Sequence, residues 1–201
     1  MDGVVIDSEK LYSLSEKKLL IRYGVCFDVS DWNYIKGCTE SQFYDLVYDK
    51  YNPPIDRDCL IVQGRAMLKK IFKEQLEYMN GFKDIYSKLK NSYRFALVTS
   101  TSLDLVNHID QFLFIKEKFD IIITSNDTET HKPLPGPYLK AMADLNLSPE
   151  ECLVIEDSIQ GIKSGIAAGC RVVALEGSIK KEHLKDADYL ISCLTDIQNI
   201  L

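Results

Sequence analysis

The chain has 201 residues, of which 46% are hydrophobic and 27% are charged. This composition is ordinary for a globular protein and allows one large domain or a core with a smaller companion. The formal net charge of −6 argues against nucleic acid or an anionic membrane as the main partner, because both select basic surfaces. No apolar run approaches the length of a membrane span, and the acidic start is not typical of a signal peptide.

The cysteines and histidines indicate neither disulfides nor a zinc site. Six cysteines are scattered along the chain without a Cys-x-x-Cys pair, and the three histidines lack ligand spacing. Cys152 and Cys170 lie in or beside apolar segments, where a thiol usually serves as a small buried hydrophobe. We therefore expect a protein of the reducing cytoplasm, and we take it to be a monomer.

Residues 9–80 are predicted to form a helical insert. Glu9–Tyr23 carries apolar residues at helical spacing with lysines between them, and Asp56–Met79 is a longer amphipathic stretch. Pro53-Pro54 breaks the chain between the helices. Because no part of this region reads as a convincing strand, we expect an all-α domain.

From residue 81 onward, short β-branched segments alternate with helical ones, which is typical of right-handed βαβ units. We therefore predict an α/β fold in which residues 1–8 and 81–201 form a Rossmann-like, three-layer core with a parallel sheet. Ser148-Pro149 is typical of a helix start, and Gly169 suits the left-handed end of a helix. The predicted strands are 95–99, 120–124, 152–155, 171–175 and 188–191, and the predicted helices are 81–90, 102–114, 136–146, 158–168 and 179–186.

Polar side chains follow three of these strands. Ser100 directly follows the first strand, Lys132 lies in the loop after the second, and Glu156 and Asp157 close the third. In an open α/β sheet, ligands bind at the carboxyl ends of the parallel strands, so these residues can converge. A hydroxyl, an ammonium and two carboxylates at one edge predict a site for a phosphorylated substrate and a divalent cation.

Each of these residues also has a purely structural interpretation. Ser100 could cap the helix that follows it, and Lys132 could be a solvated surface charge, although two prolines stiffen its loop. Asp157 or Ser158 could cap a helix and leave Glu156 exposed. Asp2-Gly3, at the start of the chain, suits a tight loop where backbone approaches a ligand.

Taken together, these segments resemble the haloacid dehalogenase-like hydrolase superfamily, in its β-phosphoglucomutase-like branch. The resemblance covers nearly the whole chain and implies a helical cap inserted after the first motif, in agreement with residues 9–80. The stretches that carry it are Met1-Asp2-Gly3-Val4-Val5-Ile6-Asp7-Ser8-Glu9, Leu97-Val98-Thr99-Ser100-Thr101-Ser102, His131-Lys132-Pro133-Leu134-Pro135-Gly136-Pro137-Tyr138, Leu153-Val154-Ile155-Glu156-Asp157-Ser158-Ile159-Gln160-Gly161-Ile162 and Ala167-Ala168-Gly169.

The resemblance implies an Mg²⁺ ion and an aspartyl-phosphate mechanism. A first aspartate attacks phosphorus, and a second one two residues later acts as general acid and then as general base. Asp2 matches the second aspartate, and its backbone carbonyl is also expected to contact the metal, together with Glu156 and Asp157. The first aspartate and its strand would precede Met1, so the chain as given is expected to lack the nucleophile, to be inactive and to leave one central slot of its sheet unfilled.

The resemblance assigns the substrate phosphate to the remaining polar residues. Ser100, Thr101 and Lys132 are expected to hold and neutralise the transferring phosphoryl group. In the cap, Glu40 lies near the place where a mutase carries an arginine for a second phosphate, and Tyr12 replaces a histidine. These departures favour hydrolysis of a small phosphorylated metabolite, such as a sugar or nucleoside phosphate, over mutase chemistry.

Three alternatives remain open on the sequence. A β-phosphoglucomutase-like phosphomutase would use the same core residues. A protein that binds phosphate and metal without turnover would agree with the chain as written. A receiver-like signalling domain also places acids, a hydroxyl and a lysine around Mg²⁺, but the large helical insert and the Glu-Asp strand end argue against it.

Overall fold

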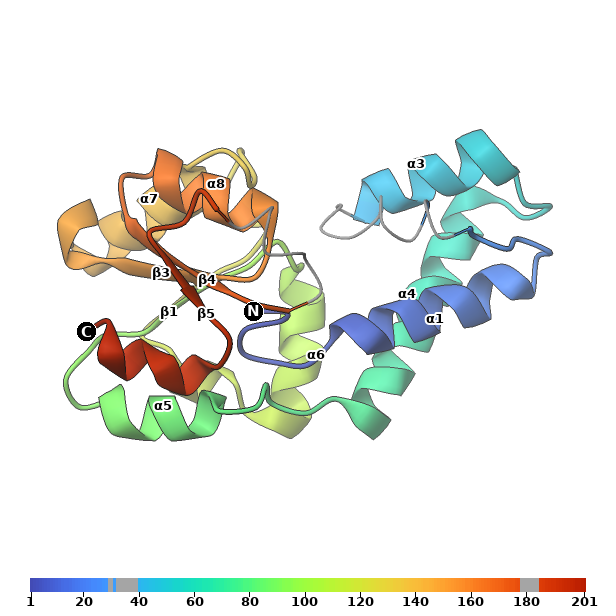
Figure 1. Cartoon of the computed structure of the whole chain (residues 1–201). Helices are drawn as coiled ribbons and strands as arrows, with labels where there is room; N and C mark the ends of the chain where they lie inside the picture. Colours follow the sequence, from blue (N-terminus) through green and yellow to red (C-terminus); the bar gives the residue numbers. More distant parts are fainter. Residues whose placement is uncertain (29–30, 32–39, 178–184) are drawn as a thin grey trace. The chain divides into compact units, whose positions relative to one another are not determined.

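The structure is a computed structural model, and it describes residues 1–28, 31, 40–177 and 185–201. The chain forms two compact units (Figure 1). One consists of Met1–Asp7 with Glu77–Leu201, and the other is Ser8–Leu76. The helical unit therefore ends at residue 76, whereas the sequence analysis placed the end of the helical insert at residue 80. The cap stretch 35–39 and most of the predicted helix 179–186 lie outside the described residues.

The first unit is built on parallel strands, as the alternating pattern predicts. The strands form two groups, β1-β2 and β3-β4-β5, and every pairing within them is parallel. Between β1 and β3 no backbone hydrogen bond is present in the described part of the chain. The family resemblance predicts an unfilled central slot in the sheet. The strands are β1 (Ala96–Val98), β2 (Ile121–Ile123), β3 (Leu153–Glu156), β4 (Arg171–Leu175) and β5 (Tyr189–Ile191).

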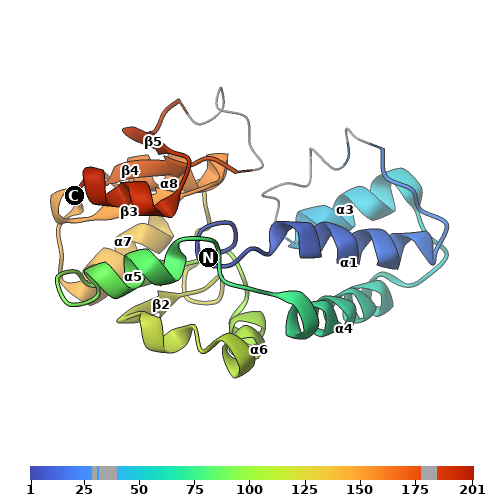
Figure 2. The same ribbon diagram turned by 60° about the horizontal axis from the view of Figure 1, so that its bottom comes forward.

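Helices cover both faces of these strands (Figures 1 and 2). Helices α7 and α8 pack against each other and against the strands, and one hydrophobic cluster joins them to β1, β2, β3 and β4. Helix α5 packs with the C-terminal 3-10 helix η4 on the other side. The bounds are α5 (Phe82–Leu89), α6 (Leu103–Leu113), η1 (Lys116–Lys118), α7 (Gly136–Leu145), η2 (Pro149–Glu151), α8 (Ile159–Ala167) and η4 (Leu194–Asn199).

The second unit is helical, and α1 and α4 are its main packing pair. Phe72 of α4 is fully buried and meets the ring of Tyr12 edge to face, with 5.2 Å between ring centroids. Asp56 caps α4 by accepting a hydrogen bond from the backbone of Cys59. The helices are α1 (Glu9–Ile21), α3 (Glu40–Tyr51) and α4 (Arg57–Gln75).

Most predicted elements of the core are confirmed to within one or two residues. Gly169 adopts the left-handed conformation, with φ of 83°, that ends α8. The expectation of a helix start at Ser148 is only partly right. Ser148 and Glu151 do form a capping box, but the helix is a single 3-10 turn because the chain enters β3 at Leu153.

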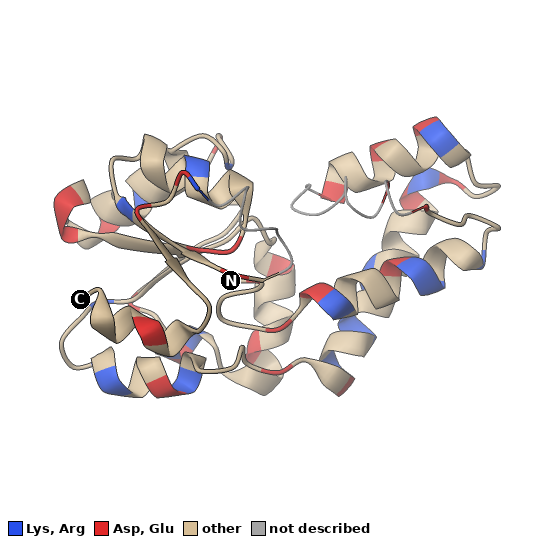
Figure 3. Cartoon of the chain, in the orientation of Figure 1, with Lys and Arg blue, Asp and Glu red and all other residues tan. Residues whose placement is uncertain are grey.

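The charges of the exposed helices are mixed in sign. Figure 3 shows acidic and basic residues interspersed along the helices of each unit. Within the described part of the chain, no helix is both long and apolar enough to cross a membrane.

Truncation of a buried side chain of α6 tests the packing of the core. Ile109 is fully buried, whereas Leu103 of the same helix is 44% exposed. Ile109→Ala is expected to lower the free energy of unfolding by about 2–5 kcal/mol, because it leaves a cavity, and Leu103→Ala by about 0.5 kcal/mol or less. Urea unfolding followed by circular dichroism measures both, and equal losses would contradict the packing described.

Candidate active site

The side chain of Lys132 bridges two strands of the core. It lies in the loop that follows β2, and only 9% of the side chain is exposed. Its ammonium donates hydrogen bonds to the carbonyl of Val98, at 3.1 Å, and to Oε1 of Glu156, at 2.5 Å. Val98 is the last residue of β1 and Glu156 the last of β3, so Lys132 joins the carboxyl ends of the two strands. The structural interpretation of Lys132 as a solvated surface charge is wrong.

Glu156 is the centre of a buried hydrogen-bond network. Its Oε1 accepts from Lys132 and from the hydroxyl of Tyr138, at 2.6 Å, and its Oε2 accepts from the hydroxyl of Ser158, at 3.1 Å. A Cβ atom on Gly161 would overlap the Glu156 carboxyl group, so this carboxylate lies directly against the backbone of α8. The alternative of an exposed Glu156 is therefore wrong. Helix capping, part of the same alternative, does occur: the Ser158 hydroxyl accepts from the backbone of Gly161 at 3.0 Å.

Asp157 lies against the loop at the start of the chain. A Cβ atom on Gly3 would overlap the Asp157 carboxylate, and Gly3 has a φ of 67°, a conformation that favours glycine. Asp2, the neighbour of Gly3, contributes its negative charge to the surroundings of Asp157. The structure thus brings Asp2, Asp157 and Glu156 into one electrostatic cluster. The strand-end argument predicts the two residues at the end of β3, and the family resemblance adds Asp2.

Thr101 and Ser100 occupy different places after β1. The Thr101 hydroxyl donates to Oδ2 of Asp2 at 2.9 Å, and its backbone N–H donates to the hydroxyl of Thr99 at 3.1 Å. Both donors of Thr101 are therefore used within the protein, and the residue orients Asp2. Ser100 lies between these two threonines and is exposed.

The two neighbouring carboxylates differ in their electrostatic state. Burial alone would raise the pKa of Glu156, but the charge of Lys132 and the hydrogen bonds from Lys132 and Tyr138 hold it below its ordinary value. Burial raises the pKa of Asp157 to about 7, and the negative charge of Glu156 adds to this effect. Glu156 is thus matched by a cation, whereas Asp157 carries negative charge that the protein only partly balances.

A divalent cation fits the Asp2 and Asp157 side of this cluster. Mg²⁺ is commonly held by one or two carboxylates together with water and substrate phosphate oxygens. Among the described residues, no group of three His, Cys, Asp or Glu side chains is arranged to hold a metal ion. Ionised Asp157 beside Asp2 is the kind of incompletely balanced charge that such an ion stabilises.

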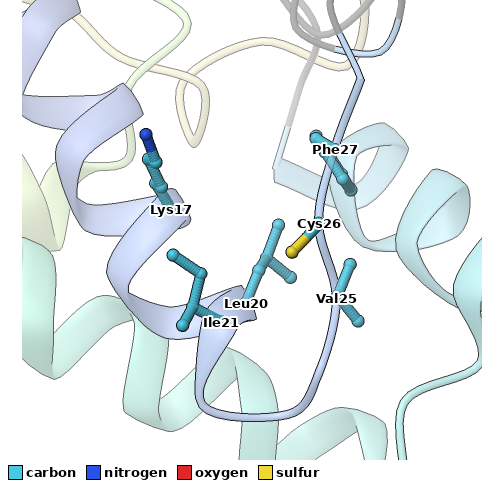
Figure 4. A pocket seen from close by; sticks show the side chains of 6 residues that line it. All are labelled: Lys17, Leu20, Ile21, Val25, Cys26 and Phe27. Atoms are coloured by element: carbon cyan, nitrogen blue, oxygen red, sulfur yellow. The ribbon is translucent and has the colours of Figure 1, made fainter.

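A small cavity lies within the helical unit (Figure 4). Its volume is about 110 Å³, and Figure 4 shows that aliphatic and aromatic side chains line it together with one ammonium and one thiol. The lining residues are Lys17, Leu20, Ile21, Val25, Cys26 and Phe27. The predicted phosphate and metal residues all belong to the other unit.

The family model for haloacid dehalogenase-like hydrolases matches residues 1–175. The chain belongs to this family. Its β3 end, its Lys132 loop and its Asp2-Gly3 loop are therefore homologous to parts of a hydrolase core, and the resemblance inferred from the motifs is confirmed.

Several phosphatases are similar to the chain. A bifunctional riboflavin kinase/FMN phosphatase from Arabidopsis thaliana is 28% identical over 204 residues, which cover 98% of this chain and 53% of that protein. The chain thus spans about half the length of this relative. A phosphorylated carbohydrates phosphatase from Thermotoga maritima is 25% identical over 174 residues, covering 84% of this chain and 79% of that one.

The solved structures show the same fold. CbbY from Rhodobacter sphaeroides, crystallised in complex with phosphate, superposes with a TM-score of 0.85 at 22% identity and covers 98% of this chain and 93% of its own. A three-layer core with a cap domain is therefore confirmed as the fold.

Two residues that contact Glu156, Tyr138 and Gly161, were not predicted from the sequence to belong to the site. Tyr138 belongs to a motif stretch, but a tyrosine two residues inside a helix is usually part of a core. Gly161 is one of three glycines in 161–169, and nothing in its spacing marks the one that lies against a carboxylate. For Tyr138, the available signal was its position six residues after Lys132, in a motif stretch that also carried a predicted site residue.

Gly3→Ala tests whether Asp157 needs the space beside Gly3. Gly24→Ala is a matched control, because Gly24 also has a positive φ, of 74°, but a Cβ atom there would meet nothing within 4 Å. Both variants are expected to lose about 1 kcal/mol of stability from the backbone conformation. Only Gly3→Ala should also weaken Mg²⁺ binding in isothermal titration calorimetry, by about tenfold or more. Equal Mg²⁺ affinities would show that Asp157 does not depend on this contact.

The raised pKa of Asp157 predicts a pH dependence of stability. Its folded pKa of about 7 exceeds its ordinary value of 3.8, so the folded state retains a proton that the unfolded state has lost between these pH values. Stability therefore falls as pH rises through this window, by at most about 1.4 kcal/mol per pH unit. Without Mg²⁺, Asp157→Asn should gain stability over the unmodified protein from pH 4.5 to 7.5. Parallel curves in urea unfolding would contradict this.

Proposed function

We propose that the protein is an Mg²⁺-dependent phosphatase of small phosphorylated metabolites that works through an aspartyl-phosphate. The observation that carries the proposal is the buried bridge from Lys132 to the carboxyl ends of β1 and β3, beside the carboxylates of Asp2 and Asp157. Membership of a hydrolase family and similarity to several phosphatases support it.

The residues of this site divide into two groups by charge. Lys132 supplies a fixed positive charge, and Ser100 an exposed hydroxyl, for the oxygens of a phosphoryl group. The carboxylate of Asp157 and the backbone carbonyl of Asp2 would hold Mg²⁺, which leaves the Asp2 side chain available for proton transfer. When bound, Mg²⁺ supplies charge neutralisation between an anionic nucleophile and an anionic phosphate.

The chemistry requires one further carboxylate, two residues before Asp2. The nitrogen of Met1 is buried and interacts with the charges of Asp2, Lys132, Glu156 and Asp157. An aspartate linked to this nitrogen by a peptide bond would therefore have its backbone next to these charged groups. The position lies outside the 201 residues.

The reaction would then follow two displacements at phosphorus. The nucleophilic carboxylate forms a bond to phosphorus while the bond to the leaving oxygen breaks, and Asp2 donates a proton to that oxygen. Water next attacks the aspartyl-phosphate, Asp2 accepts its proton, and inorganic phosphate leaves. The hydrogen bond from Thr101 to Oδ2 holds Asp2 in one orientation for both proton transfers.

The relatives supply a first set of substrates to test. One is named for action on FMN and another for action on phosphorylated carbohydrates, so sugar phosphates and nucleotide monophosphates come first. Glu40 begins α3, and its Oε1 accepts a hydrogen bond of 2.9 Å from the Nε–H of Arg65 in α4. This acid occupies the neighbourhood where a mutase would need a cation for a second phosphate, which favours hydrolysis.

An N-terminally extended protein tests the proposal. An apolar strand ending in aspartate is added directly before Met1, and the matched control ends in asparagine. The aspartate version is expected to hydrolyse p-nitrophenyl phosphate and members of the substrate panel, to stop with chelator, and to lose about 10²–10⁴-fold in kcat with Asp2→Asn. The asparagine version should be inactive. Phosphate and Mg²⁺ binding without turnover by the aspartate version would instead support a non-catalytic binding protein.

A further inference from the structure

We propose that the sulfur atoms of Cys152, Cys170 and Met142 form a binding site for a soft monovalent cation such as Cu(I). All three residues belong to the first unit. None of them is among the residues proposed to bind phosphate or Mg²⁺, so the inference does not depend on the proposed function. From the sequence, both thiols were expected only as small buried hydrophobes, and Met142 had no predicted role.

The register of the sheet places the two thiols side by side. Strands β3 and β4 are parallel, and their first residues, Leu153 and Arg171, are paired. Cys152 and Cys170 each lie one residue before this pair, so their side chains leave the sheet on the same face. Both contact the same hydrophobic cluster. Cys152 also raises the pKa of Cys170, which is an electrostatic effect of a nearby group.

Met142 of α7 supplies the third sulfur atom. Its side chain and that of Cys170 are both buried. The Cys170 thiol donates a hydrogen bond to Sδ of Met142, with 3.6 Å between the two sulfur atoms. A cation in place of this proton would lie between two ligands, because metal–sulfur bonds of about 2.3 Å span this separation at an angle of about 100°, near the tetrahedral value.

The kind of ligand selects the kind of ion. Thiolate and thioether sulfur are soft ligands, and they favour Cu(I) over harder divalent ions. Zinc sites are built from cysteine, histidine and carboxylate groups, so a thioether is a poor substitute in them. Aliphatic side chains, among them Val154 and Val172, pack in the same cluster as the sulfur atoms. A soft cation is therefore the ligand that this set of donors fits best.

A direct disulfide between the two cysteines fits the backbone less well. Adjacent strands lie about 4.8 Å apart, and the Cβ atoms of neighbouring residues in a parallel pair have about the same separation. A disulfide requires about 3.8 Å between its two Cβ atoms. The strands would have to move together to form the disulfide, whereas an ion bonded to both sulfur atoms fits the wider spacing.

Binding exchanges protons for the ion. Burial raises the pKa of Cys152 and, to about 11, that of Cys170, and the charges of Glu151 and Glu150 add to the two effects respectively. Both thiols therefore carry their protons at neutral pH. When Cu(I) binds, two S–H bonds break, two Cu–S bonds form and two protons pass to water, with no change in oxidation state. Cys152 is only partly buried, which gives the ion and the protons access to solvent.

Competition with a chromogenic Cu(I) chelator such as bicinchoninate, in the absence of oxygen, tests the site on the 201-residue protein. The unmodified protein is expected to bind one Cu(I) tightly and to release two protons, which a pH indicator follows in weak buffer. Cys152→Ser and Cys170→Ala should each lower the Cu(I) affinity by about a hundredfold or more, and Met142→Leu by about tenfold. Equimolar Zn²⁺ should not displace the Cu(I).

Two control variants show whether the effect belongs to these three sulfur atoms. Cys193→Ser removes another partly buried thiol of the same unit, and Met79→Leu replaces another partly buried methionine. Both should keep the Cu(I) affinity within about threefold of the unmodified protein. Met142→Leu nearly conserves volume, so it keeps the fold while it removes one ligand, and urea unfolding without copper checks this.

Three results would overturn the inference. The first is the absence of tight Cu(I) binding by the unmodified protein. The second is an unchanged affinity in Cys152→Ser or in folded Met142→Leu. The third is a loss in Cys193→Ser as large as that in Cys152→Ser, because thiols elsewhere would then hold the ion. Hydrolysis of p-nitrophenyl phosphate by the N-terminally extended protein tests the proposed function separately, and either result there leaves the Cu(I) measurements valid.

Discussion

The buried ion pair between Lys132 and Glu156 is the interaction on which the site depends. It joins the loop after β2 to the end of β3, and through the Val98 carbonyl it also reaches β1. No backbone hydrogen bond between β1 and β3 is present in the described residues, so side chains carry this connection at the carboxyl edge. A buried ion pair offsets the cost of removing its charges from water only when its remaining donors and acceptors also form hydrogen bonds. Tyr138 and Ser158 satisfy that of Glu156.

The strand geometry explains why two adjacent carboxylates have different roles. Glu156 is the last residue of β3, and successive side chains of a strand point to opposite sides. Glu156 turns toward α7 and α8, where a tyrosine, a serine and a lysine surround it. Asp157 turns toward the Gly3 loop, where its neighbours are other acids. One carboxylate is thereby stabilised in its charged form, and the other is left to be neutralised by a proton or a cation.

The sequence predicted the edge of the sheet that carries the site, because apolar strands followed by polar residues leave few alternatives in an α/β fold. Lys132, Glu156 and Asp157 do meet there. The hydrogen-bond partners of the site residues could not be predicted in the same way. The family resemblance assigned Thr101 to the substrate phosphate, whereas in the structure its hydroxyl donates a hydrogen bond to Asp2. This contact depends on the path of the Asp2 loop, which the sequence does not give.

Two glycines allow the two carboxylates to lie directly against backbone. The sequence indicated a tight loop at Gly3 but did not name Asp157 as its neighbour, and nothing in the sequence marked Gly161. Gly161 lets Glu156 lie on the first turn of α8, and Gly3 lets Asp157 lie on the backbone of the first loop. In both cases, the absence of one carbon atom brings a charged group closer to backbone than any other residue would allow. The backbone at Gly161 thus limits the position of the Glu156 carboxylate, and the backbone at Gly3 limits that of the Asp157 carboxylate. An arrangement fixed by main chain costs little reorganisation when a charged ligand arrives, and this is the property that electrostatic catalysis requires.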